Sequence, residues 1–134
     1  MSRRRPPLPV LLLLVLMLVL LLPAPPAAAG PVDWREVPAT GEGRQWWDAG
    51  SLRVTRDGRL SVLSRFLPAG DDARGSLYVM ELDCEQELYR DTSVNGLPQF
   101  RAEWQAAAGD ALSTATVRAA CRAGSALLEV ERRG

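Results

Sequence analysis

Histidine and lysine are both absent from this sequence of 134 residues, and cysteine occurs only twice. Without histidine, the chain lacks the commonest general base, the usual zinc ligand and the Ser-His-Asp catalytic arrangement. Arginine therefore supplies all 16 positive charges, against 16 carboxylates. Three arginines and no carboxylate lie in residues 1–29, so the remainder carries 13 positive and 16 negative charges, a net of −3. That balance argues against a domain that binds nucleic acid by neutralising phosphates.

The first 29 residues have the three zones that are typical of a secretory signal peptide. Three arginines at 3–5 precede an apolar run, Leu8–Leu22, and the small residues that follow end in three alanines. An uncleaved membrane anchor is the alternative, but a spanning helix needs about 20 apolar residues, and Pro23 follows this shorter run directly. We expect cleavage after Ala29 and membrane contact only before cleavage. The mature chain is then periplasmic, surface-located or secreted.

The two cysteines, Cys84 and Cys121, lie in the part that we expect to be exported. Two such thiols usually pair in an oxidising compartment. A crosslink that closes a loop of this length contributes about 4 kcal/mol in the chain-entropy model. A catalytic dithiol favours a Cys-x-x-Cys spacing, and a metal site needs more ligands than these. We therefore predict a stabilising disulfide, with no metal and no cofactor.

Several segments alternate apolar and polar residues, as half-buried strands do. The dipeptides Asp57-Gly58 and Asn95-Gly96 favour hairpin turns. The longest strand-rich stretch is Leu77–Tyr89, which places Cys84 on its core face and the acidic residues on the other. The expected strands are 32–37 with Trp34 turned inward, 52–55, 60–66, 77–89, 85–94 after a bend, and 100–104.

One helix is expected near the C-terminus. Asp110 suits its N-cap, apolar or small residues recur at helical spacing through 111–123, and Gly124 suits its C-cap. Residues 126–130 either extend this helix or add a strand. The predicted fold is a small α+β domain over residues 30–125, a mostly antiparallel β-sheet packed by a C-terminal helix with one disulfide, followed by a tail at 126–134.

A series of framework motifs occurs in a recognisable order. The series is Trp34, Gln-Trp-Trp-Asp-Ala-Gly-Ser at 45–51, the turn at 56–58, 62–66, Tyr-Val-Met-Glu-Leu-Asp-Cys at 78–84, Leu-Tyr-Arg at 88–90, and a late helix with Cys121. In this the chain resembles the surface-adhesin protein E-like domains of bacterial exported proteins. The resemblance implies a small antiparallel sheet, a terminal helix and joined cysteines. For the founding adhesin it also implies binding of host extracellular proteins, but no adhesin binding residue maps onto this chain.

Four side chains are candidates for contact with a ligand. Trp46 and Trp47 point to opposite faces if they lie in a strand, so one of them either packs against a loop or forms an exposed platform for a sugar or peptide. We favour packing of both, one under the loop at 39–44, because tryptophan is usually mostly buried. Arg53 and Arg65 belong to a cluster around the first hairpin, which either docks an anionic partner or shields a strand edge.

An acidic run follows the middle of the chain: Glu81, Asp83, Glu85, Glu87 and Asp91. The first four recur at period two, which indicates the solvated face of a strand, with Arg90 and Arg101 as cross-strand partners. A glycosidase pair or a calcium site is the alternative.

These features favour a non-enzymatic exported module that binds an envelope or extracellular protein or glycan. The alternatives are an accessory subunit of an envelope complex and, third, a hydrolase that uses the acidic strand. The hydrolase ranks last because nothing in the sequence would activate a nucleophile. No nucleic-acid partner is expected, and the sequence leaves the oligomeric state open.

Overall fold

The computed structural model describes residues 6–23 and 30–134. The arginine triplet and the expected cleavage site after Ala29 lie outside these residues, so cleavage stays a prediction. Helix α1, Leu8–Leu20, consists of apolar residues, and none of its side chains is buried. Within the described part of the chain, no helix combines the length and the apolar character needed to cross a bilayer.

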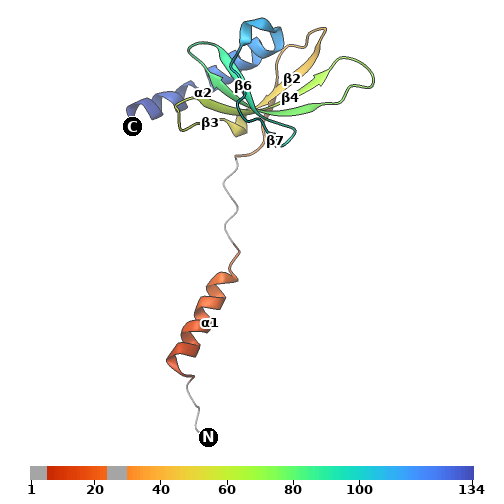
Figure 1. Ribbon diagram of the computed structural model, residues 1–134. Helices are drawn as coiled ribbons and strands as arrows, with labels where there is room; N and C mark the ends of the chain where they lie inside the picture. Colours follow the sequence, from red (N-terminus) through yellow and green to blue (C-terminus); the bar gives the residue numbers. More distant parts are fainter. Residues whose placement is uncertain (1–5, 24–29) are drawn as a thin grey trace.

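An antiparallel sheet and one long helix form the rest of the chain (Figure 1). The strands are β1 Trp34–Glu36, β2 Gly43–Asp48, β3 Arg53–Val54, β4 Leu60–Pro68, β5 Ser76–Asp83, β6 Leu88–Val94, β7 Leu97–Pro98 and β8 Gln105–Ala106. Their order is β1-β2-β4-β5-β6-β7, with β3 beside β4 and β8 beside β6. Short 3-10 turns occupy Ala49–Ser51 and Ala107–Gly109, and helix α2 covers Ala111–Arg133. This confirms the predicted α+β class.

The core lies between one face of the sheet and α2. Cross-strand pairs such as Leu60 with Leu82 and Val62 with Met80 put their side chains on the same face. All four are almost completely buried, and α2 covers them with apolar side chains at helical spacing. The residues that α2 contributes are Leu112, Val117 and Ala120.

The C-terminal end of the helix differs from the expectation. The helix does not stop at Ala123 with Gly124 as its cap but continues to Arg133. Gly124 is buried within the helix, and a Cβ atom there would overlap the side chain of Leu60. The glycine therefore allows the helix to approach the sheet closely, rather than ending the helix.

The first predicted hairpin is confirmed, and the second is only partly correct. Arg53 pairs with Ser61 across a turn in which Gly58 has φ +74°. Asn95-Gly96 also turns as expected, but the returning strand is only Leu97–Pro98. The predicted strand at 100–104 is absent from the described chain, because the backbone turns at Arg101 (φ 65°) and pairs with β6 again only at β8.

Candidate functional site

The four predicted contact residues lie on the strands β2, β3 and β4, of which β2 and β3 both pair with β4. Trp47 is 4% exposed and belongs to the core, whereas Trp46 is 8% exposed and lies on the opposite face. Neither ring is an open platform in this structure. Arg53 and Arg65 are exposed, on β3 and β4. A ligand contact by any of these residues stays a prediction.

Arginine side chains, rather than the loop at 39–44 alone, cover Trp46. The Cζ atom of Arg65 lies 4.4 Å from the centroid of the Trp46 ring and 5.3 Å from that of Trp34. Arg44 stacks over Trp46 at 4.7 Å and binds Glu36 through two N–H groups, which lowers the pKa of Glu36. Stacked guanidinium groups thus cover a sheet face that α2 does not reach.

The acidic run does not form one solvated strand face. Glu81 is only 6% exposed and accepts the Nε–H of Arg90 at 2.8 Å, with the Nη2 atom of Arg90 2.7 Å from the same oxygen, while Trp104 stacks on Arg90. Strand β5 ends at Asp83, and the chain turns through Cys84–Glu87 because Glu87 adopts φ 52°. The expected partner Arg90 is correct for Glu81, whereas no ion pair of Arg101 occurs in the described chain.

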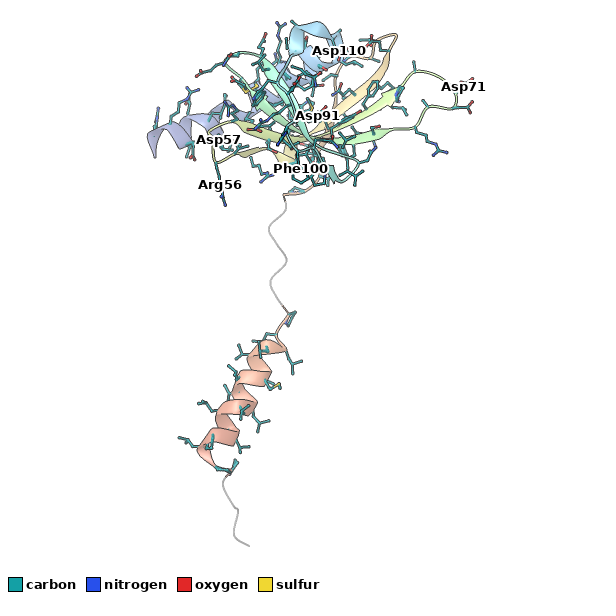
Figure 2. All side chains as sticks on the ribbon, in the orientation of Figure 1. Arg56, Asp57, Asp71, Asp91, Phe100 and Asp110 are labelled. Carbon is teal, nitrogen blue, oxygen red and sulfur yellow. A yellow bond between two sulfur atoms is a disulfide. The ribbon has the colours of Figure 1, made fainter. Side chains whose placement is uncertain are left out.

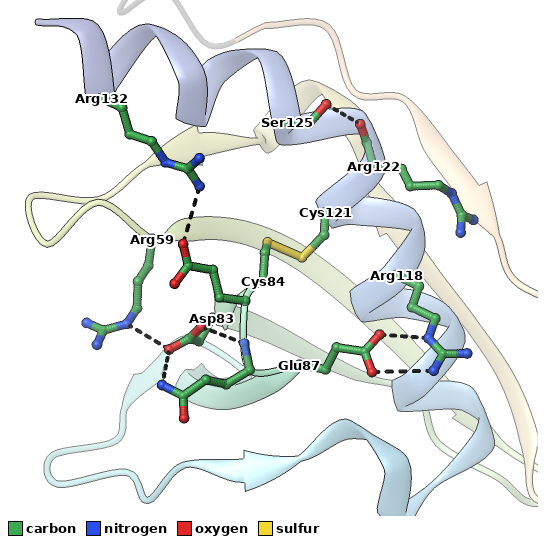
Figure 3. Close-up of a disulfide and its surroundings, with 11 residues drawn as sticks. Arg59, Asp83, Cys84, Glu87, Arg118, Cys121, Arg122, Ser125 and Arg132 are labelled. Carbon is green, nitrogen blue, oxygen red and sulfur yellow. Dashed lines mark hydrogen bonds and ion pairs between the residues drawn. A yellow bond between two sulfur atoms is a disulfide. The ribbon is translucent and has the colours of Figure 1, made fainter.

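Each of the last three acids before β6 has its own arginine (Figure 3). Asp83 pairs with Arg59, Glu85 with Arg132 and Glu87 with Arg118. Among the described residues, no group of three potential ligands is placed to hold a metal ion.

The disulfide predicted from the two cysteines is present. Cys84 in the turn after β5 bonds to Cys121 in α2, with the Cα atoms 5.7 Å apart (Figure 3). The bond joins α2 to the end of the sheet at which the turn through Cys84–Glu87 lies.

The structure also contains a cavity of about 150 Å³ between the inner face of the sheet and the start of α2. We call it the acidic cavity, because three carboxylates line it and none of the arginines in the described chain does. Figure 2 labels two of them, Asp91 over the sheet and Asp110 at the start of α2. Its lining is Glu42, Gln45, Phe66, Tyr78, Met80, Tyr89, Asp91, Asp110, Leu112 and Ser113.

The path of α2 explains why a cavity lies here. The helix packs mainly on β2, β3 and β4, so Tyr78 of β5 and Tyr89 and Asp91 of β6 stay partly exposed on the inner face. Strand pairing puts Tyr78, Met80 and Tyr89 on that inner face, and Asp91 is aligned with Met80 across a register shift. The Tyr89 hydroxyl lies 3.4 Å from Ser113 Oγ, which connects the β6 wall to the helix.

The three carboxylates of the cavity are in different electrostatic states. Burial raises the pKa of Asp110, but hydrogen bonds from the hydroxyl and N–H of Ser113 outweigh this and hold its pKa below the usual range. Asp110 is therefore an ionised N-cap. Asp91 makes no hydrogen bond or ion pair through its carboxylate in the described chain, and burial raises its pKa. Glu42 is exposed at the rim.

The comparisons with known proteins now bear on this geometry. The model of the surface adhesin-E family matches residues 35–127, which include every residue that lines the cavity and both cysteines. The chain belongs to the surface adhesin-E family. A search of curated proteins and a search of solved structures each found no match. The family description indicates a surface or extracellular location and an adhesin-like, non-enzymatic role.

The sequence alone did not predict most of the residues of the acidic cavity. The sequence pattern groups Asp91 with the acidic run, whereas the strand pairing aligns Asp91 with Met80 on the inner face. A signal was available, because Tyr89 and Asp91 alternate on the face that continues from Tyr78 and Met80. A carboxylate on the apolar face of a strand indicates either a buried ion pair or a site.

We expect Asp91→Asn to stabilise the protein at neutral pH. Because burial raises the pKa of Asp91 above its usual 3.8, the folded state becomes less stable as pH rises through that raised value and Asp91 ionises. The asparagine variant does not ionise. Its advantage should therefore be absent below the ordinary pKa and complete at neutral pH. Glu42, Asp110, Tyr78 and Tyr89 also face the cavity and are unchanged by the substitution.

Thermal unfolding of both proteins at pH 3 and at pH 7 measures this difference. A melting temperature for the variant that is equal to or below that of the wild type at pH 7 would contradict the prediction.

Proposed function

We propose that this chain is an exported, non-enzymatic binding module that recognises an envelope or extracellular protein. Three observations support the proposal: the family match, the disulfide, which is typical of oxidising compartments, and an N-terminal segment of signal-peptide type. Whether the module acts in the periplasm, on the surface or in the medium depends on where this partner lies.

The acidic cavity is the observation that carries the proposal. It has the features of a recognition site, a partly enclosed hollow with aromatic walls and a few convergent polar groups. Ser113 is the one serine that lines the cavity. Its hydroxyl donates to the helix cap Asp110 at 2.6 Å and therefore has a structural role. A cavity of about 150 Å³ accepts the end of one side chain, and its three carboxylates favour a cationic protein group over a neutral or acidic glycan.

Binding of the oxidised exported protein to immobilised envelope and extracellular-matrix proteins, beside immobilised polysaccharides, tests this function. We expect saturable binding to a protein surface that weakens as ionic strength rises, because screening reduces the attraction between charges. Binding only to polysaccharide, or no saturable binding to any protein, would contradict the proposal.

An accessory subunit of an envelope complex is the second candidate, and one surface feature favours it. Phe100, labelled in Figure 2, is 89% exposed, and Leu97, three residues earlier in the chain, is also exposed. Exposed aromatic side chains of this kind are common in stable protein contacts. The native mass in gentle extracts distinguishes the two, since a subunit migrates with its complex and a free module as a small species.

A further inference from the structure

We infer that the acidic cavity binds the guanidinium group of an arginine side chain presented by a partner protein. This rests on the proposed function as a protein-binding module and names the chemical group that the module recognises. The inference follows from charge, from an acceptor that has no donor, and from the shape of the walls.

Charge is the first argument. Other buried or partly buried carboxylates of the described chain have partners: Glu81 pairs with Arg90 and Asp83 with Arg59, while Asp48 and Asp110 accept hydrogen bonds from N–H or hydroxyl groups. Asp91 is half-buried and has neither an ion pair nor a hydrogen bond in the described part of the chain. Leaving a buried carboxylate without a counter-charge costs stability, so the arrangement is explained if a cation from another molecule completes it.

The second argument is independent of the carboxylates. Gln45 lines the cavity and is only 7% exposed, and its amide Nε2 donates to Ser64 Oγ at 3.0 Å. Its Oε1 accepts no hydrogen bond from any described residue. Among the described residues, the one fully enclosed side-chain nitrogen or oxygen that lacks a partner is Thr116 Oγ1, so Gln45 Oε1 is open to the cavity and can accept a hydrogen bond from a ligand there. The cavity therefore offers a neutral acceptor as well as three anionic ones.

The walls favour guanidinium over ammonium. Phe66, Tyr78 and Tyr89 supply aromatic surface, on which a planar guanidinium group stacks. Guanidinium is also more weakly hydrated than ammonium, so it loses less on entering a partly enclosed site, and its fork of donors suits several acceptors at once.

The chain itself already uses this combination of groups. Arg90 places its guanidinium 4.5 Å from the centroid of Trp104 and binds Glu81. The acidic cavity has the carboxylates and the aromatic rings of that arrangement, but the arginine must come from another molecule. Its volume of about 150 Å³ is comparable to cavities that hold one benzene-sized group.

Titration of the oxidised full-length chain with N-acetyl-L-arginine methylamide, followed by calorimetry or NMR, tests the inference. We expect saturable binding in the millimolar range. The neutral citrulline counterpart should not bind, and the lysine counterpart should bind at least about threefold more weakly. Asp91→Asn should weaken binding of the arginine probe about tenfold, the loss expected for one charge-assisted hydrogen bond.

Two further variants keep the test decisive. Asp71→Asn is the matched control, because Asp71 is an exposed aspartate in the loop between β4 and β5 (Figure 2) and should leave the affinity unchanged. Glu42→Gln at the exposed rim should weaken binding without endangering the fold, in case Asp91→Asn alters it. Equal binding of citrulline or lysine, or equal affinity in all three variants, would overturn the inference.

The result is distinguishable from that of the proposed function. Saturable binding to a protein together with no arginine binding would leave the module in place and remove the cavity as its recognition site. Arginine binding without saturable binding to any protein would support the arginine site and contradict the protein-binding function.

Discussion

Replacing both Cys84 and Cys121 with serine should lower the free energy of unfolding by about 4 kcal/mol. The disulfide joins residues that are 37 positions apart, so its loss allows the unfolded chain many more conformations. The loop contains β6, β7, β8 and the first half of α2, which is more than a third of residues 30–134. Small domains have about 5–15 kcal/mol in total, so much of the stability should be lost.

Urea unfolding of the oxidised double variant and wild type measures this effect. Wild type treated with a reducing agent is the control, since it should lose a similar amount without any substitution. An unchanged midpoint in the variant would show that the crosslink contributes little to stability.

The same crosslink also bears on the acidic cavity. Tyr89, Asp91 and Asp110 all lie inside the disulfide loop, and Gln45 lies outside it. Reduction should therefore increase the mobility of one wall relative to the other, and the arginine probe should bind more weakly to reduced protein that is still folded.

Substitution of Gly43, the first residue of β2, by alanine should destabilise the protein by about 3 kcal/mol. Gly43 has φ +148°, a backbone conformation that residues with a side chain rarely adopt. A Cβ atom there would also overlap the backbone oxygen of Leu67, which belongs to the neighbouring strand. Because backbone atoms cannot rotate away as side chains do, β2 and β4 would have to separate.

Gly41→Ala is the matched control for this substitution. Gly41 lies in the same turn, but its Cβ would meet nothing within 4 Å, and its φ is not in the positive range. Chemical unfolding should show little change for Gly41→Ala and a clear loss for Gly43→Ala. Similar stabilities for the two variants would contradict the argument.

Gly43 also affects the site, because it follows Glu42 directly. The carbonyl of Glu42 accepts the N–H of Ala69 at 2.9 Å, which holds this residue at the rim of the acidic cavity. We expect Gly43→Ala to weaken arginine binding as well as stability.

Local sequence patterns were sufficient to predict a substantial part of the fold. The turn at Asp57-Gly58, the N-cap Asp110 and the pairing of two cysteines all depend on neighbouring residues or on the expected compartment. The family could likewise be suggested from framework motifs, which the match over residues 35–127 confirms.

Long-range contacts account for the corrections. Gly124 looks like a cap in the sequence, and only its contact with Leu60 explains why the helix continues. Glu81 has the spacing of a solvated residue, yet it is buried against Arg90, on which Trp104 stacks. The strand pattern indicates Arg90 as a partner, but Trp104 and Leu60 are distant in sequence from the residues they contact, so no local pattern indicates them.

The sequence by itself determined the composition and charge of the chain, its signal-like N-terminus, its main turns and its two half-cystines. Only the tertiary structure decided which carboxylates pair with arginines and that the half-buried Asp91 has no partner among the described residues. Asp91 and Gln45 come from strands that are not neighbours in the sheet, and Asp110 comes from the helix. They meet because α2 covers β2 to β4 and leaves β5 and β6 partly open beside its first turn, and a packing arrangement of this kind depends on all elements together.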